Sequence, residues 1–118
     1  MLSVKKMLLK LLTPKNTIYT TSNLNHLASC SASIYAIGKI GILYIAAKNT
    51  SSQLAIGSDA TCTINIPELM GVSKGCGYSG NTAMLASITT SGTLTMRATG
   101  AAWQATYDCA IAIPVIIK

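Results

Sequence analysis

IYAIGKIGILYIAA, residues 34–47, is the longest apolar run of the chain and is interrupted only by Gly38, Lys39 and Gly41. A membrane-spanning helix needs ~20 apolar residues, and this run is shorter and carries a lysine near its middle. Two glycines weaken a helix, whereas isoleucine and tyrosine favour a pleated strand. We therefore predict a β-strand buried on both faces, by the domain core on one side and by neighbouring subunits on the other. Gly38 and Gly41 would allow a bulge or bend between its two halves.

The composition of the whole chain indicates a protein that assembles. Its 118 residues are close to the usual size of a single domain. Hydrophobic residues make up 50% of it and charged residues only 10%, against about 25% charged residues in typical soluble proteins. So few charges cannot cover the surface of a soluble domain, which implies that part of this surface is buried against other subunits. We therefore expect an obligate homo-oligomer.

The net charge of +6 could attract nucleic acid, anionic lipid or acidic glycans. Beyond the N-terminal arm, however, the basic residues are scattered along the chain without interleaved aromatic residues. This distribution is typical of a solvated surface, so no nucleic-acid partner is predicted.

The four cysteines, Cys30, Cys62, Cys76 and Cys109, are widely spaced. No pair has the short spacing that is typical of zinc or redox sites, so no metal is predicted. An even count permits two disulfides. Without an export signal, we favour free thiols that are mostly buried and act as small hydrophobic side chains.

Two segments resemble targeting signals but lack the required context. Residues 1–12, MLSVKKMLLKLL, are interrupted by Lys10, and the LASC sequence at 27–30 follows the polar stretch TTSNLNH where a hydrophobic one is required. We therefore expect no export signal and no membrane insertion.

A helix is predicted over residues 2–12, because Pro14 disfavours helical geometry in Thr13 and cannot donate a backbone hydrogen bond. Its apolar residues follow the a/d spacing of a coiled coil; they are Met1, Val4, Leu8 and Leu11. An isolated helix of this length is marginal in water, so Val4, Leu8 and Leu11 are candidate oligomerisation residues in a stalk stub at 1–14. A helix packed on its own domain and a basic helix on a membrane surface are the alternatives.

Residues 15–118 are predicted to form one all-β head domain. Alternation of apolar and polar residues, bounded by turn residues, predicts strands at 17–21, 34–47, 53–56, 60–66, 83–90, 93–98 and 105–117, the second of them in two halves. Ser91 and Gly92 provide a hairpin turn between two of these strands. Loops are expected at 22–33 and over the glycine-rich residues 68–82. About eight short strands predict an antiparallel β-sandwich or jelly roll.

The sequence offers little for catalysis or for cofactor binding. GCGYSG at 75–80 matches the dinucleotide pattern G-x-G-x-x-G, but no strand–turn–helix unit surrounds it, so we interpret the match as coincidence and predict no cofactor. The conventional acid–base candidates lie far apart in the sequence; they are His26, Asp59, Glu68 and Asp108. His26 stands alone in a polar stretch and is expected to be a solvated loop residue. We therefore predict that the protein is not an enzyme.

Ligand-binding candidates come from aromatic and amide side chains. Trp103 is the only tryptophan and stands beside Gln104 in a turn of small residues. An exposed aromatic face next to an amide can bind the apolar face of a sugar. Packing of Trp103 in the core or at a subunit interface is the alternative. Tyr78 and Asn81, in the glycine-rich segment, are further candidates of the same kind.

Several segments together resemble the C-terminal head domains of bacteriophage tail fibres and baseplate receptor-binding proteins. They are Ile37-Gly38-Lys39, the NIPE sequence at 65–68, Gly80-Asn81, the hairpin ITTSGTLTM at 88–96 and the turn that contains the tryptophan. The likeness covers residues 33–118 and is one of strands and turns, without a chemical signature.

This resemblance implies a homotrimeric β-sandwich head on a helical stalk, located at a phage or prophage tail tip. Such a head binds a saccharide or protein of the bacterial surface and contacts other copies of itself and other tail proteins. The protein would be made in the bacterial cytoplasm without a signal peptide and become part of the virion tail, extracellular after release. A purely structural virion protein without a ligand, and a polysaccharide-degrading enzyme with a site between subunits, are the alternatives.

Overall fold

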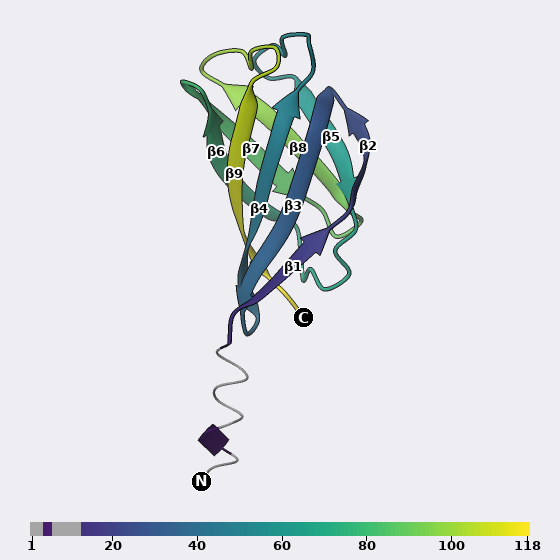
Figure 1. Cartoon of the computed structure of the whole chain (residues 1–118), viewed down its shortest axis with the longest axis vertical. Helices are drawn as coiled ribbons and strands as arrows, with labels where there is room; N and C mark the ends of the chain where they lie inside the picture. Colours follow the sequence, from purple (N-terminus) through teal and green to yellow (C-terminus); the bar gives the residue numbers. More distant parts are fainter. Residues whose placement is uncertain (1–3, 6–12) are drawn as a thin grey trace.

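The computed structural model describes residues 4–5 and 13–118, and residues 13–118 form an all-β domain (Figure 1). Its strands are β1 (Lys15–Tyr19), β2 (Thr21–Asn25), β3 (Leu27–Ile37), β4 (Ile40–Asn49), β5 (Asp59–Ile64), β6 (Ser73–Ser79), β7 (Thr82–Ile88), β8 (Thr93–Thr99) and β9 (Asp108–Ile116). They form one antiparallel sheet in the order β1-β3-β4-β9-β6-β7-β8-β5-β2. The predicted all-β, antiparallel class is confirmed, but the strands belong to a single curled sheet instead of two separate ones.

The ends of this sheet meet, so that it forms a near-barrel. β1 and β2 follow each other along the chain, yet they lie at opposite edges of the sheet, β1 beside β3 and β2 beside β5. The hydroxyl of Thr21 donates a hydrogen bond of 2.8 Å to the carbonyl of Cys30 across this seam. Continuity of the chain therefore holds the first and last strands of the sheet together.

The interior of the near-barrel is filled by alternate residues of each strand, as a half-buried strand requires. In β4, Leu43 and Ile45 are fully buried, while Ile42 and Tyr44 point outward and are about half exposed. The inward set is almost entirely apolar and forms one continuous core. The largest fully buried side chains are Trp103, Leu43, Ile45, Ile64, Met84, Ile88, Leu94, Met96, Ile111, Ile113 and Val115.

The apolar run at 34–47 forms a hairpin, which corrects the prediction of one bent strand. It contains the end of β3 and most of β4, joined by a tight turn in which Gly38 has a φ of +62°. Ile37 pairs with Ile40 directly beside the turn. A positive φ suits glycine because it has no Cβ, so Gly38 marks a reversal of the chain and not a bulge.

Two predicted elements are confirmed. Residues 83–90 and 93–98 form the β7–β8 hairpin, with Gly92 at a φ of +99° in its turn. The alternating segment at 60–66 contains β5, in which Cys62 and Ile64 point into the core.

Three other predictions are wrong. The polar residues 22–33 form most of β2 and the first half of β3, and the glycine-rich 68–82 contains β6. The strand predicted at 53–56 is reduced to a single bridge between Leu54 and Trp103. Backbone pairing with neighbouring strands overrode the local composition in the first two of these segments.

Gly75 and Gly77 have a packing role where the sequence shows a dinucleotide-like pattern. Both lie in β6, which pairs with β9 so closely that a Cβ at either position would overlap backbone atoms. At Gly77 the overlap would be with the carbonyl oxygen of Ala110, and at Gly75 with that of Ala112. Glycine is the residue that permits such a close approach of two backbones.

Replacing Gly77 with alanine should destabilise the domain by at least ~2 kcal/mol, because the backbone of β9 would have to move. Urea unfolding followed by circular dichroism would measure the loss. Gly71→Ala is the matched control, since a Cβ at Gly71 meets no atom within 4 Å and should change stability by less than ~0.5 kcal/mol. Equal stability of the two variants would contradict the close-approach argument.

The predicted stalk helix at 2–12, with Leu8 and Leu11, lies outside the described residues, apart from Val4 and Lys5. Val4 is 52% exposed. Within residues 4–5 and 13–118, no helix is long and apolar enough to cross a membrane.

Candidate ligand site at the loop end

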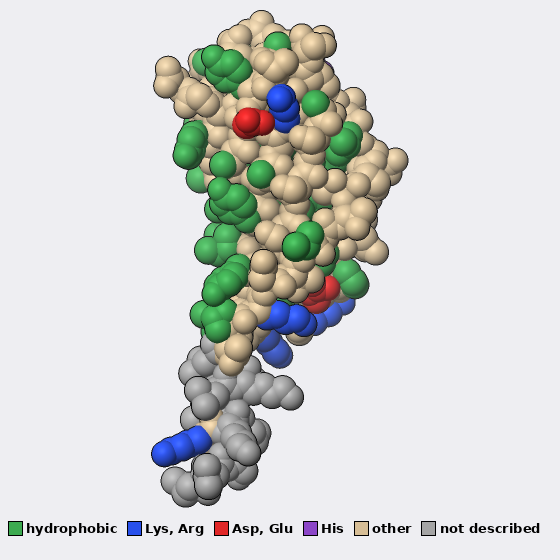
Figure 2. All heavy atoms as spheres, viewed as in Figure 1, with side chains coloured by type: hydrophobic (Ala, Val, Ile, Leu, Met, Phe, Trp, Pro, Cys, Tyr) green, Lys and Arg blue, Asp and Glu red, His purple; other side chains and the backbone are tan. Residues whose placement is uncertain are grey.

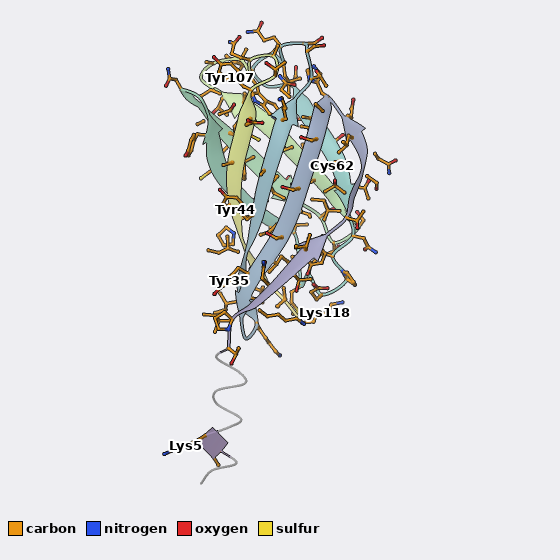
Figure 3. All side chains as sticks on the ribbon, in the orientation of Figure 1. Lys5, Tyr35, Tyr44, Cys62, Tyr107 and Lys118 are labelled. Atoms are coloured by element: carbon orange, nitrogen blue, oxygen red, sulfur yellow. The ribbon has the colours of Figure 1, made fainter. Side chains whose placement is uncertain are left out.

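The two ends of the near-barrel differ in what they carry. The β4–β5 and β8–β9 loops and the β6–β7 turn converge at one end, which we call the loop end. The C-terminus and the start of β1 lie at the opposite end (Figure 1). Tyr107 stands at the loop end, directly before β9 (Figure 3).

A hollow of about 320 Å³ lies between the β6–β7 turn and the β8–β9 loop. We call it the loop-end hollow, and it is lined by Ser79, Asn81, Thr82, Ala101, Ala102, Gln104 and Tyr107. Asn81 and Gln104 are exposed, and Tyr107 is 49% exposed. The hollow therefore combines two amide side chains with an accessible aromatic ring, a set that can hydrogen-bond sugar hydroxyls and stack on an apolar sugar face.

The β6–β7 turn is shaped to receive the tyrosine ring. Gly80 has a φ of +57°, and a Cβ built on it would lie 3.2 Å from Cε2 of Tyr107. The hydroxyl of Ser79 donates to the carbonyl of Asp108 at 2.6 Å, which ties the end of β6 to the start of β9. These contacts hold the ring of Tyr107 beside Asn81.

The other wall of the hollow is held by Thr82. Its hydroxyl oxygen lies 2.5 Å from the carbonyl oxygen of Thr99 and 2.8 Å from that of Ala101. The backbone of the β8–β9 loop is thereby fixed where it leaves β8.

Asn49, the last residue of β4, is the polar centre of the loop end and is fully buried. Its amide nitrogen donates to the carbonyls of Trp103 and Gln104, both at 3.0 Å, and its backbone N–H donates to the carbonyl of Tyr107 at 3.0 Å. A buried amide with these partners is well satisfied. Asn49 therefore sets the path of the loop that presents Gln104 and Tyr107.

The amide oxygen of Asn49 is satisfied from the other side. It accepts from the backbone N–H of Thr50 at 2.8 Å and lies 2.9 Å from Nδ1 of His26. His26 is thus half-buried and packed against the polar centre, which corrects its prediction as a solvated loop residue.

The structure places the four predicted ligand residues in three different surroundings. Asn81 and Gln104 come together in the loop-end hollow. Tyr78 is 66% exposed but points outward from β6 and does not line the hollow. Trp103 is fully buried in the core, so it offers no face to a sugar, and the alternative of core packing is correct for it. Its indole N–H is buried without an acceptor among the described residues.

Two residues of the loop end were missed by sequence reasoning. Tyr107 directly precedes a strand, but the neighbouring Trp103 was favoured as the aromatic residue of a ligand site. Asn49 lies at an inward position of β4, in step with Leu43 and Ile45. A polar residue at an inward position of a strand predicts a buried, hydrogen-bonded side chain. The burial of Asn49 could therefore have been predicted from the sequence.

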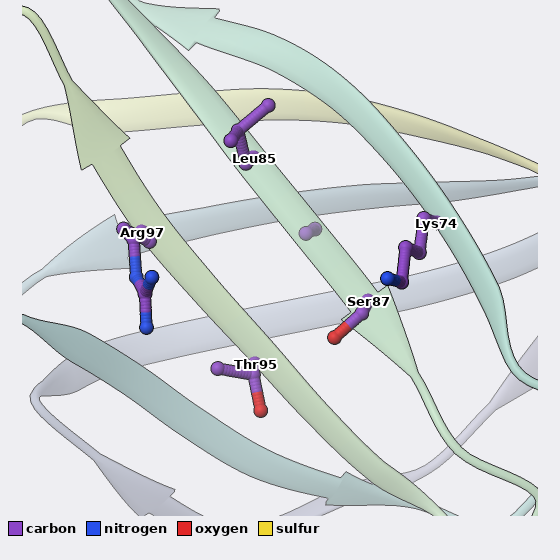
Figure 4. A pocket seen from close by; sticks show the side chains of 6 residues that line it. Lys74, Leu85, Ser87, Thr95 and Arg97 are labelled. Atoms are coloured by element: carbon purple, nitrogen blue, oxygen red, sulfur yellow. The ribbon is translucent and has the colours of Figure 1, made fainter. Parts of the chain in front are cut away.

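A second, smaller hollow lies on the outer face of β6, β7 and β8 and measures about 250 Å³. Figure 4 shows Lys74 and Arg97 on either side of Ser87 and Thr95. Arg97 forms an ion pair of 2.9 Å with Asp59, and half-exposed pairs of this kind contribute little to stability. The hollow is shallow and basic.

The acid–base candidates remain dispersed. Asp59 pairs with Arg97, Glu68 accepts a hydrogen bond from the hydroxyl of Tyr19, and His26 contacts Asn49. Among the described residues, no three side chains of the His, Cys, Asp or Glu type are grouped as metal ligands would be. Comparison of the chain with family models, curated proteins and solved structures yields no significant match.

Replacing Asn49 with alanine should destabilise the domain by about 2–3 kcal/mol, because two buried carbonyls lose their donor. Thermal and urea unfolding would measure this loss, and hydrogen exchange should show faster exchange over residues 100–107. Asn16→Ala, at an exposed position of β1, is the matched control and should leave both quantities unchanged. A loss below ~0.5 kcal/mol for Asn49→Ala would contradict its role as the polar centre.

Proposed function

We propose that this chain is the receptor-binding head of a bacteriophage or prophage tail fibre or baseplate protein, and that it binds a saccharide of the bacterial surface without enzymatic activity. The observation that carries the proposal is the loop-end hollow, in which Tyr107, Asn81 and Gln104 meet. Aromatic rings and amides are the groups that recognise uncharged sugars. The dispersed acid–base groups give no support to a catalytic alternative.

The arrangement of the two ends supports this proposal. The chain enters the domain at the end where β1 begins, and the hollow lies at the opposite end (Figure 1). A head attached to a tail through its N-terminal side would therefore present the loop end to the cell. The nested pairing of β4 with β9, β5 with β8 and β6 with β7 also occurs in jelly rolls, and it supports the proposed likeness to tail-fibre heads.

The proposed head is a homotrimer, with Val4, Leu8 and Leu11 as the seam of a short stalk. A hollow of this size makes few contacts with one sugar, so a single site is expected to bind weakly. Three linked sites raise the effective concentration of each for a repeating surface polysaccharide, which converts weak sites into firm attachment. The partners are other copies of the chain, other tail proteins and the bacterial surface, and the location is the virion tail.

A purely structural virion protein is the second candidate. The observation that favours it is the extent of outward-facing apolar residues on β3, β4 and β9, which suits a protein whose role is assembly. The two candidates differ in the loop-end hollow, which only a receptor-binding head requires.

The test is binding of the labelled protein to an array of bacterial surface polysaccharides and to whole cells of candidate hosts. Substitution of both amides, Asn81→Ala with Gln104→Ala, should weaken binding at least tenfold, and Tyr107→Ala should do the same. Asn16→Ala, at an exposed position away from the hollow, is the matched control with unchanged binding. Binding that survives all substitutions, or no binding by the wild-type protein to any array member or cell, would remove the receptor-binding proposal and leave the structural one.

A further inference from the structure

The outer surface of β3, β4 and β9 carries a continuous apolar patch, which we call the outer apolar face. It consists of Tyr35, Ile37, Ile40, Ile42, Tyr44 and Ile116, each between 44% and 70% exposed. The strand register places them in adjacent rows, with Ile37, Ile40 and Ile116 in one row. Tyr35 and Ile42 form the next row. Tyr35 and Tyr44 lie along the same side of the molecule (Figure 3).

No charged residue of β3, β4 or β9 lies within this face, and the exposed Lys39, in the turn between Ile37 and Ile40, stands at its end. On β4, Lys48 is the only charged residue, and it pairs with Asp108 of β9 at the loop end. β3 contains none, and β9 contains none after Asp108. Figure 2 shows hydrophobic side chains gathered along this side of the molecule with no charged group between them.

The face continues into a groove of about 530 Å³ between β9 and the segment before β6. Met70 and Val72, which are 58% and 61% exposed, line it together with Pro114 and Ile116, and Lys74 stands at its edge. The eight large apolar side chains of the face and groove therefore expose on the order of 100 Å² each, or roughly 800 Å² in total.

The exposed apolar area of this face indicates which kind of partner covers it. The largest apolar patch of a typical monomer measures about 300–600 Å², whereas a stable interface buries about 800 Å² on each partner. Charge is confined to the edges of the face, at Lys39 and Lys74, so its apolar centre has no complementarity to nucleic acid or to an anionic surface. Large apolar and tyrosine side chains without charges are the composition of the buried centre of a homomeric interface.

We propose that the outer apolar face is the surface through which copies of this chain bind one another. The inference deepens the oligomeric part of the proposed function and is independent of ligand binding at the loop end. It places the subunit contact on the head domain itself, in addition to any contact through the N-terminal residues.

The test is the mass of the full chain by sedimentation velocity at several concentrations. The wild-type protein should be an oligomer, and Ile42→Lys with Tyr44→Lys should shift it to the monomer mass, because two unpaired charges would be buried at the contact. Ile56→Lys, at a loop position with 55% exposure, is the matched control and should remain oligomeric. Circular dichroism and thermal unfolding of each variant show whether the fold is intact.

A monomeric wild-type protein, or a double variant that assembles as the wild type does, would overturn the inference. Monomers that instead sediment with phosphatidylcholine vesicles would overturn it in favour of a lipid surface. A monomeric double variant that still binds polysaccharide weakly would support the interface and the receptor-binding site separately. A double variant that assembles normally and binds polysaccharide would contradict the proposed interface but not the proposed binding site.

A separate observation concerns the seam of the near-barrel. Cys30 of β3 and Cys62 of β5 are free, with their sulfurs 3.8 Å apart, although these strands lie near opposite ends of the sheet order. A disulfide brings two sulfurs to about 2.05 Å, so closure needs a movement of less than ~2 Å. Cys62 is 2% exposed and Cys30 is half-buried, which leaves Cys30 as the accessible member.

We infer that Cys30 and Cys62 form a disulfide when the protein meets a disulfide oxidant such as oxidised glutathione. The contact with Cys62 and burial raise the pKa of the Cys30 thiol, so the attack on one sulfur of oxidised glutathione proceeds through the small thiolate fraction of Cys30. This attack forms a mixed disulfide and releases one glutathione thiolate. Cys62 then attacks Sγ of Cys30 as a thiolate and releases the second glutathione. The two thiol protons are taken up by the two released glutathione thiolates, so two cysteines are oxidised and one glutathione disulfide is reduced.

The test uses the full chain with the exposed Cys76 replaced by serine, incubated with oxidised glutathione. Peptide mapping should find Cys30 joined to Cys62, and the midpoint of thermal unfolding should rise by about 10 °C or more. Cys109 is the internal control, because its side chain is only 4% exposed, out of reach of glutathione, and it should remain reduced. A stable mixed disulfide at Cys30, without transfer to Cys62, would overturn the inference.

Discussion

Closure of the sheet is the constraint on which the rest of this molecule depends. β1 and β2 are one continuous piece of chain, yet they pair with β3 and β5 at opposite edges. The sheet must curl until those edges meet, because no loop is available to bridge them. Once it is curled, every inward side chain faces another, and the core of the near-barrel forms without a second layer. The contact between the two edges at this seam therefore accounts for the curled shape of the sheet.

The curl also explains why β6 needs glycine and why the two surfaces of β4 differ. Within the curled sheet, β6 and β9 approach until no Cβ fits between their backbones, and glycine stands at both positions. Along β4, alternate residues point into the core, so the remaining apolar residues face outward. The apolar residues on the outer face of this isoleucine-rich strand are the basis of the proposed interface between copies of the chain.

The parts of the fold that follow from local patterns could be predicted from the sequence. The β7–β8 hairpin is an example, because alternation and the Ser91–Gly92 turn specify it within a few residues. The strands of polar or glycine-rich composition, β2 and β6, could not be, since their pairing is decided by residues far away in the chain. The residues of the candidate site also divide into those that could be predicted and those that could not. Asn81 and Gln104 were recognisable as exposed amides, but the burial of Trp103 and the approach of Tyr107 to Gly80 depend on how two distant loops meet.

The anchors of the loop end have one property in common. Asn49, Thr82 and Ser79 all reach backbone carbonyls, at positions 99, 101, 103, 104 and 108. Every amino acid supplies a carbonyl, so these anchors do not depend on which side chains the loop carries. Mutations at the exposed positions can therefore alter the chemistry of the hollow while the path of the loop is kept. A scaffold of this kind would let the proposed recognition surface change under selection, with little loss of stability at each step.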